Sequence, residues 1–120
     1  MKKISLKSEF GWIKVNGDKY EKDIMIHSDG SVTKREKKKS KDFKPDYGHT
    51  PLSECELEFL AQERFDALYV GTGHEAALPI TPQALEILQE YKAVILPTPE
   101  VMRKIEQEKG KFVAIIHVTC

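Results

Sequence analysis

The sequence predicts an α/β protein in which an N-terminal antiparallel β meander joins a βαβαβ-type mixed sheet with helices packed on it. Before about residue 50 the apolar residues follow a period of two, and the Asn16-Gly17 pair is typical of a tight hairpin turn. After that point the period is 3.6, and helical segments alternate with short apolar runs that suit buried strands. The 120 residues are long enough to bury one core, so residues 1–120 are predicted to form a single compact domain.

The predicted meander has three strands separated by tight turns. The strands are residues 10–15, 20–27 and 31–35, and Asp29-Gly30 forms the second turn. In the middle strand, Ile24 and Ile26 alternate with Asp23 and Met25. Because successive side chains of a strand point to opposite faces, this alternation indicates one apolar face and one more polar face.

Three helices are predicted from one repeated start signal, a threonine followed by a proline. The pairs are Thr50-Pro51, Thr81-Pro82 and Thr98-Pro99. A threonine hydroxyl accepts a hydrogen bond from a free N–H of the first turn, and a proline at the first helical position has no N–H to leave unpaired. One strand is predicted after each helix, at residues 67–70, 93–96 and 112–118. Right-handed crossovers would make these three strands parallel neighbours.

Parallel neighbours end at the same edge of a sheet, and ligands of α/β domains bind at such edges. Three segments are therefore expected to meet there: the Gly71-Thr72-Gly73 bend, Pro97-Thr98 and residues 117–120. Helix N-termini at Thr81 and Thr98 would add partial positive charge. The candidate residues for binding a ligand or a partner at this edge are Gly71, Thr72, Gly73, His74, His49 and His117.

Residues 71–77 also fit the relaxed dinucleotide fingerprint G-x-G-x-x-A. That motif requires a helix beginning at its second glycine, whose N-terminus binds the pyrophosphate. Here Pro79 and the later start signal at Thr81-Pro82 move the helix downstream, and no acidic residue follows the next strand to bind a ribose. NAD binding is not predicted, and a smaller anion is the alternative.

No catalytic residue, metal site or cofactor is predicted. The four histidines, His27, His49, His74 and His117, are scattered singly without the spacing of paired metal ligands. Cys55 and Cys120 are too few for a disulfide framework or a four-cysteine zinc site. Cys120 lies three residues after His117, so in a strand the two side chains would point to opposite faces rather than pair as nucleophile and base. No nucleophile elbow and no P-loop are present.

Nineteen basic residues balance nineteen acidic residues, so overall charge recruits neither nucleic acid nor an anionic membrane. The apolar runs are shorter than the about 20 residues that span a bilayer, and the lysines of the N-terminus are not followed by the apolar segment of a signal peptide. A cytoplasmic protein without membrane contact is therefore expected.

Residues 34–44 are a local exception to this balance. They carry seven basic residues, Lys34, Arg35, Lys37, Lys38, Lys39, Lys41 and Lys44, against Glu36 and Asp42. Clustered lysines neutralise the phosphates of nucleic acids. A solvated loop is the simpler interpretation, because charge runs of this kind usually face water.

Several stretches, in order along the chain, resemble one protein family. They are residues 10–20 (FGWIKVNGDKY), His49-Thr50-Pro51, residues 70–73 followed by 75–78, and the ending at residues 117–120. On these stretches the chain resembles the family of the adipogenesis-associated domain protein and, more distantly, mitochondrial complex I assembly factor 3. The resemblance covers nearly the whole chain and implies a compact domain with an antiparallel β portion joined to a mixed sheet. It implies roles in the assembly of other proteins or in regulation of cell state, and it supplies no catalytic residue.

Two hypotheses of function follow. The first is a non-catalytic protein-interaction or assembly-factor-like module that binds an unidentified protein partner through the strand edge. The second is binding of a small ligand or anion, with or without catalysis, at Gly71-Thr72-Gly73. A shallow apolar patch at this edge would favour the first hypothesis, and a pocket holding an anion would favour the second.

Overall fold

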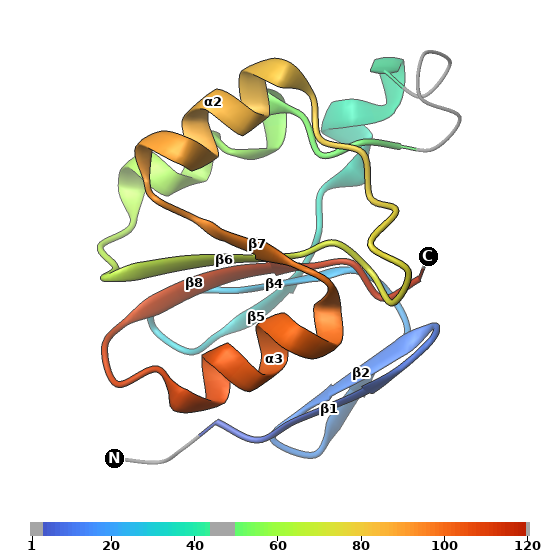
Figure 1. The fold of residues 1–120 in the computed structure, drawn as a ribbon, viewed down its shortest axis with the longest axis vertical. Helices are drawn as coiled ribbons and strands as arrows, with labels where there is room; N and C mark the ends of the chain where they lie inside the picture. Colours follow the sequence, from blue (N-terminus) through green and yellow to red (C-terminus); the bar gives the residue numbers. More distant parts are fainter. Residues whose placement is uncertain (1–3, 44–49, 120) are drawn as a thin grey trace.

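The computed structural model describes residues 4–43 and 50–119 as a two-sheet α/β domain (Figure 1). Its elements are β1 (Leu6–Glu9), β2 (Trp12–Val15), β3 (Asp18–Tyr20), β4 (Ile24–Ile26), β5 (Val32–Lys34), the 3-10 helices η1 (Lys37–Phe43), η2 (Glu54–Glu56) and η3 (Glu58–Gln62), then β6 (Ala67–Gly71), α2 (Pro82–Glu90), β7 (Val94–Leu96), α3 (Thr98–Gln107) and β8 (Phe112–Ile116). None of the helices in the described ranges is both long and apolar enough to cross a membrane.

The strands form a three-stranded sheet in the order β1-β2-β3 and a five-stranded sheet in the order β5-β4-β8-β6-β7. The small sheet is antiparallel throughout. In the larger sheet β6 pairs in parallel with both β7 and β8, whereas β4 pairs antiparallel with β8 and β5. The predicted antiparallel portion, the mixed sheet and the three parallel neighbours are therefore confirmed, with β6 in the middle of the three.

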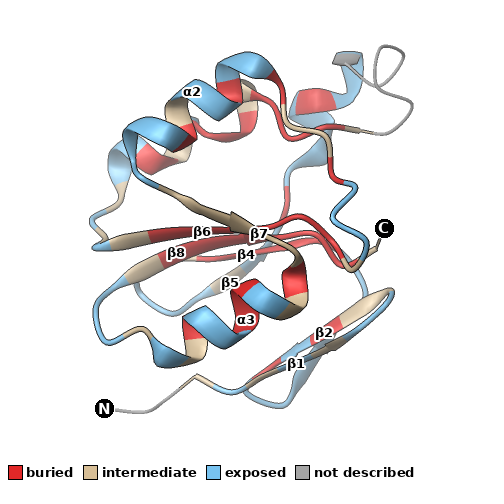
Figure 2. Cartoon of the chain, in the orientation of Figure 1, coloured by how far each residue is buried: buried red, intermediate tan, exposed pale blue. Residues whose placement is uncertain are grey.

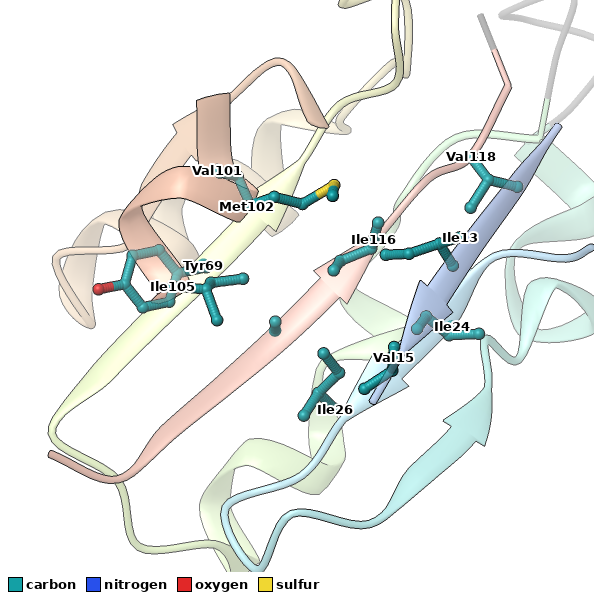
Figure 3. Close-up of a cluster of buried hydrophobic side chains, with 11 residues drawn as sticks. Ile13, Val15, Ile24, Ile26, Tyr69, Val101, Met102, Ile105, Ile116 and Val118 are labelled. Carbon is teal, nitrogen blue, oxygen red and sulfur yellow. The ribbon is translucent and has the colours of Figure 1, made fainter. Parts of the chain in front are cut away.

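The five-stranded sheet is covered on both faces (Figures 1 and 2). On one face, α3 and the small sheet pack against β4, β6 and β8, as Figure 3 shows. The buried side chains there include Ile13, Val15, Ile24, Ile26, Tyr69, Val101, Met102, Ile105 and Ile116. On the other face, Leu52, Leu57, Leu60, Ala84 and Leu88 from the 3-10 helices, the segment before them and α2 pack against Met25, Leu68, Val70, Val113 and Ile115. Full burial of a Val, Leu, Ile or Met side chain contributes about 1.5–3 kcal/mol.

Burial on both faces corrects the prediction of a polar face for the strand at residues 20–27. Met25 is buried in the second cluster, and Asp23 is buried as well. The strand itself is shorter than predicted, because residues 21–23 lead the chain from β3 in one sheet to β4 in the other. The Asn16-Gly17 hairpin is confirmed: both residues have positive φ, 51° and 91°, and Val15 pairs with Asp18.

The helix start signals have three different outcomes. Thr81 caps α2 as predicted, since its hydroxyl accepts a hydrogen bond from Ala84 N–H. The helix predicted from Thr50-Pro51 is wrong: the chain there makes an isolated bridge from Leu52 to Ile80 and then the 3-10 helices η2 and η3. Thr98 begins α3, but its hydroxyl bonds elsewhere and does not cap the helix.

Candidate functional site

The C-terminal ends of the three parallel strands meet at Thr98, the first residue of α3. Its hydroxyl donates to the carbonyl of His117, at 2.7 Å, and accepts from Gly73 N–H, at 2.9 Å. Its own N–H donates to the Gly73 carbonyl, and His117 N–H donates to the Gly71 carbonyl, each at 3.0 Å. One buried hydroxyl therefore joins the bend after β6, the start of α3 and the end of β8.

The glycines of the bend are required by this close packing. A Cβ on Gly71 would lie 2.8 Å from Thr98 Oγ1 and 3.3 Å from Thr98 Cα, so the two segments could not approach as they do. Gly73 has φ 101°, in the region that favours glycine.

The backbone donors of the bend are already used within the chain. Thr72 N–H donates to the Leu96 carbonyl at 3.0 Å, Gly73 N–H to Thr98, and His74 N–H to the Thr119 carbonyl at 3.3 Å. An anion at the bend would have to displace these partners. The small-ligand and anion hypothesis for Gly71-Thr72-Gly73 therefore has no unpaired N–H of Thr72, Gly73 or His74 to support it.

His74 lies beside the tip of the β1–β2 hairpin. Its Nε2 is 2.9 Å from the Ser8 hydroxyl, which donates its own proton to the Trp12 carbonyl at 2.9 Å. The Phe10 ring is next to the His74 ring, with centroids 6.4 Å apart. The tip is fixed to the end of β8 by a hydrogen bond from Gly11 N–H to the Val118 carbonyl, at 2.8 Å.

These contacts create a surface that the sequence did not predict. Phe10 is 60% exposed, although it is a large apolar side chain. The bend continues from His74 through Glu75, Ala76 and Ala77, which are all exposed. We call the set Phe10, His74, Glu75, Ala76, Ala77 and Thr119 the rim surface. The sequence did carry one signal for this surface: Phe10 is followed by Gly11, a residue typical of turns. Because aromatic residues favour strands, Phe10 was assigned to a strand rather than to the two-residue turn.

His117 lies just below the rim, in a buried polar cluster. It is only 6% exposed, and its Nδ1 is 2.7 Å from Asp23 Oδ2. Its Nε2 is 3.3 Å from the Thr119 hydroxyl. The prediction that His117 reaches the strand edge is correct for its backbone, but its side chain points into the domain.

Arg35 completes this cluster, so its assignment to a solvated basic stretch is wrong. Its guanidinium binds both carboxylate oxygens of Glu56, at 2.8 and 2.9 Å, and donates to Asp23 Oδ2 at 2.9 Å and to the Pro51 carbonyl at 2.8 Å. A bidentate pair of this kind suits a buried arginine. Arg35 thus ties the segment before η2 to the start of β4.

The charges of the cluster stabilise one another. Burial alone would raise the pKa of Asp23, but the hydrogen bond and charge of His117, the Val118 N–H and the charge of Lys37 together hold that pKa well below its usual value. Burial would lower the pKa of Arg35, and Glu56 and Asp23 more than reverse this, so the pKa is raised. Within the described residues, the charged side chains of Asp23, Arg35 and Glu56 thus pair with one another inside the fold.

Of the remaining candidates, His49 and Cys120 lie outside the described residues. Cys55 is half-buried in η2 rather than on an α-helix. Within residues 4–43 and 50–119, no group of three or more His, Cys, Asp or Glu side chains is placed to hold a metal ion.

No family model matches the sequence, and no curated protein matches it either. Solved structures do match. A conserved hypothetical protein, PH1505 from Pyrococcus horikoshii OT3, is 33% identical over 99% of this chain and 100% of its own, with a TM-score of 0.82. This chain belongs to the PH1505 family.

Two further structures extend the comparison. A protein named MT938 is also 33% identical, over 98% of this chain and 97% of its own, with a TM-score of 0.78. A protein from Bordetella parapertussis is 17% identical, over 96% of this chain and 95% of its own, with a TM-score of 0.53, and it shows the fold alone. The names of the PH1505 relatives state no activity, and the resemblance to the adipogenesis-associated family stays a prediction.

Proposed function

We propose that this chain is a non-catalytic protein-interaction module, of the assembly-factor kind, that binds a partner protein through the rim surface in the cytoplasm. The observation that supports this proposal is the exposed Phe10 ring, which is held over the ends of the parallel strands. Ala76 and Ala77, which follow His74 in the bend, are also exposed and apolar. Exposed apolar side chains bordered by polar ones are typical of a protein-binding site.

The position of Phe10 is fixed rather than loose. The hairpin tip is hydrogen-bonded to Val118, and Ser8 bonds His74 beside the ring. A pre-organised aromatic side chain loses little conformational freedom on binding, which favours it as an anchor.

The polar groups near the rim are committed to internal partners. His117 bonds Asp23, Thr98 bonds His117 and Gly73, and the N–H groups of the bend bond carbonyls and a hydroxyl of the chain. A nucleophile or base must reach its substrate, and these side chains face inward. Their arrangement supports a binding role over a catalytic one.

The exposed area of Phe10 sets how much binding affinity its burial against a partner could supply. A phenylalanine offers roughly 200 Å² of apolar surface, so its 60% exposure leaves about 120 Å² for a partner to cover. At about 25 cal/mol per Å² this surface is worth up to about 3 kcal/mol, or roughly 100-fold in affinity.

The test compares affinity-tagged parent, Phe10→Ser and Leu85→Ser proteins as baits in native lysate, with quantitative mass spectrometry. Leu85 is a matched control because it is 37% exposed on α2, on the opposite side of the five-stranded sheet. A protein captured by the parent is then purified, and its affinity for each variant is measured. The proposal expects Phe10→Ser to bind at least tenfold more weakly and Leu85→Ser to bind as the parent does.

Two results would contradict the proposal that the rim surface binds a partner protein. One is the absence of any reproducible partner for the parent protein. The other is a purified partner whose affinity falls equally in Phe10→Ser and Leu85→Ser, or not at all.

A further inference from the structure

Strand β5 is an outer strand of the five-stranded sheet and pairs only with β4 in the described part of the chain. Arg35 N–H donates to the Asp23 carbonyl just beyond the paired strands. Hydrogen bonds alternate along an antiparallel strand, so the N–H and C=O groups of Val32 and Lys34 point away from β4. These groups form a free edge that can pair with another strand.

A hollow of about 330 Å³ opens beside this edge. Its apolar lining comes from Tyr20, Ile24 and Val32, which belong to three strands. Ile24 lies opposite Lys34 in the pairing of β4 with β5, so the two side chains share a face with Val32. A strand added to β5 would therefore direct alternate side chains toward Lys34 and then toward this hollow.

Charged side chains also line the hollow. They are Lys19, Lys22 and Lys34 with two acidic residues, Glu21 and Asp23. Of these two, Asp23 already bonds Arg35 and His117. Lys22 and Lys34 also line an adjoining hollow of about 140 Å³, which adds Lys37. The two hollows share Lys22 and Lys34 along the free edge, and they also share Glu21 and Asp23.

This pair of lysines carries charge that the fold does not neutralise. Lys19 lies 4.0 Å from Glu21, and Lys37 lies 3.5 Å from Asp23. Within residues 4–43 and 50–119, neither Lys22 nor Lys34 has an ion-pair partner. Lys22, followed by Lys38 and Lys37, lowers the pKa of Lys34 by repulsion between like charges.

We propose that the β5 edge is a docking site for an acidic, strand-forming segment of a partner protein. The pairing geometry sets its pattern as acid-x-apolar, because residues two apart share a face of a strand. A carboxylate of the segment binds Lys34 and Lys22, and the apolar side chain two positions away enters the hollow at Val32 and Ile24. Main-chain hydrogen bonds to Val32 and Lys34 supply the rest of the contact.

An acidic peptide fits these observations better than nucleic acid does. Nucleic acid would use the lysines alone, whereas a strand also uses the free N–H and C=O groups and the apolar hollow. The β5 edge does not include Phe10 or His74, although the adjoining hollow reaches Thr119 at the border of the rim surface. The inference uses neither the Phe10 ring nor His74 and so does not rest on the proposed function.

The test uses the full chain and fluorescence anisotropy. The ligand is a fluorescein-labelled nonapeptide, Ser-Thr-Glu-Thr-Glu-Thr-Val-Thr-Ser, and its neutral counterpart carries Gln in place of both Glu residues. Three variants are compared with the parent: Lys22→Gln/Lys34→Gln, the control Lys7→Gln/Lys104→Gln at exposed sites outside both hollows, and Phe10→Ser. Circular dichroism confirms that each variant is folded.

The parent is expected to bind the acidic peptide and to bind the neutral peptide more weakly. An exposed ion pair is worth roughly a factor of 1.5 to 5, so the Lys22→Gln/Lys34→Gln variant should bind the acidic peptide roughly tenfold more weakly. The control pair and Phe10→Ser should leave the affinity unchanged. Hydrogen exchange of the Val32 and Lys34 amides should slow in the complex.

Four results would overturn the proposal. In the first, the acidic peptide does not bind, and the lysines then only protect the edge from aggregation. In the second, the neutral peptide binds equally well, or the control pair loses as much affinity as Lys22→Gln/Lys34→Gln. In the third, a labelled oligothymidine binds more tightly and is lost in that same variant, which would assign the lysines to nucleic acid. In the fourth, the acidic peptide slows exchange at His74 rather than at Val32 and Lys34.

Discussion

Replacing Thr98 with valine removes the hydroxyl that joins the three strand ends while keeping the shape of the side chain. Two buried groups then lose their partner, the N–H of Gly73 and the C=O of His117. Leaving a buried polar group unpaired costs about 1–3 kcal/mol, so Thr98→Val is expected to lower the free energy of unfolding by about 2–6 kcal/mol. The total free energy of unfolding of a small domain is only about 5–15 kcal/mol, so this loss should be easy to measure.

The assay is urea unfolding followed by circular dichroism and by the fluorescence of Trp12. Thr98→Ser is the matched control, since it keeps the hydroxyl and removes one methyl group, at a cost of about 1 kcal/mol. The reasoning would be refuted if Thr98→Val were within about 1 kcal/mol of the parent, or if Thr98→Ser were the less stable of the two variants.

Three further predictions concern the same region. Gly71→Ala places a Cβ 2.8 Å from Thr98 Oγ1 and should cost about 1–3 kcal/mol in urea unfolding; an unchanged midpoint would show that the segments separate freely. Arg35→Met removes the cation shared by the buried carboxylates of Glu56 and Asp23, of which Asp23 keeps His117 and Lys37, and should cost about 3–5 kcal/mol. A loss below about 1 kcal/mol would contradict the cluster. The pKa of Asp23 is lowered although burial opposes this, chiefly through His117, so its contribution to stability is present above its unfolded pKa and is lost as pH falls. Stability measured from about pH 5 to pH 2 should therefore fall less steeply in Asp23→Asn than in the parent, and equal slopes would refute the assignment.

The parallel half of the fold could be predicted from sequence because its signals are local. Thr81-Pro82 fixes the start of α2 by a hydroxyl that acts within one helical turn. The short apolar runs favoured buried strands, and the handedness of crossovers then placed the bend at Gly71 and the end of β8 at one edge.

The segment after Thr50-Pro51 could not be predicted in the same way. Its conformation depends on residues distant in the sequence. Arg35 donates hydrogen bonds to the Pro51 carbonyl and the Glu56 carboxylate, and Leu52 pairs with Ile80. These contacts hold the chain in an extended stretch and 3-10 turns and override its helical pattern.

The candidate site likewise combines features that the sequence predicts with features that depend on contacts between distant residues. The sequence located the meeting of Gly73 and His117 because strand order determines it. It missed Phe10, because only the docking of the hairpin tip on Val118 brings that ring to His74. It also treated Arg35 as solvated, because a run of charges gives no sign of a buried partner such as Asp23.

The measurement that tests the rim surface most directly is site-specific photocrosslinking in cells. A photoreactive phenylalanine analogue is placed at Phe10 in one protein and at Leu85 in another, and covalent adducts are identified by mass spectrometry. Since Phe10 lies on the rim surface and Leu85 on the far helix, we expect one discrete protein adduct from position 10 and none of that partner from position 85. No adduct from position 10, or the same adducts from both positions, would contradict the account.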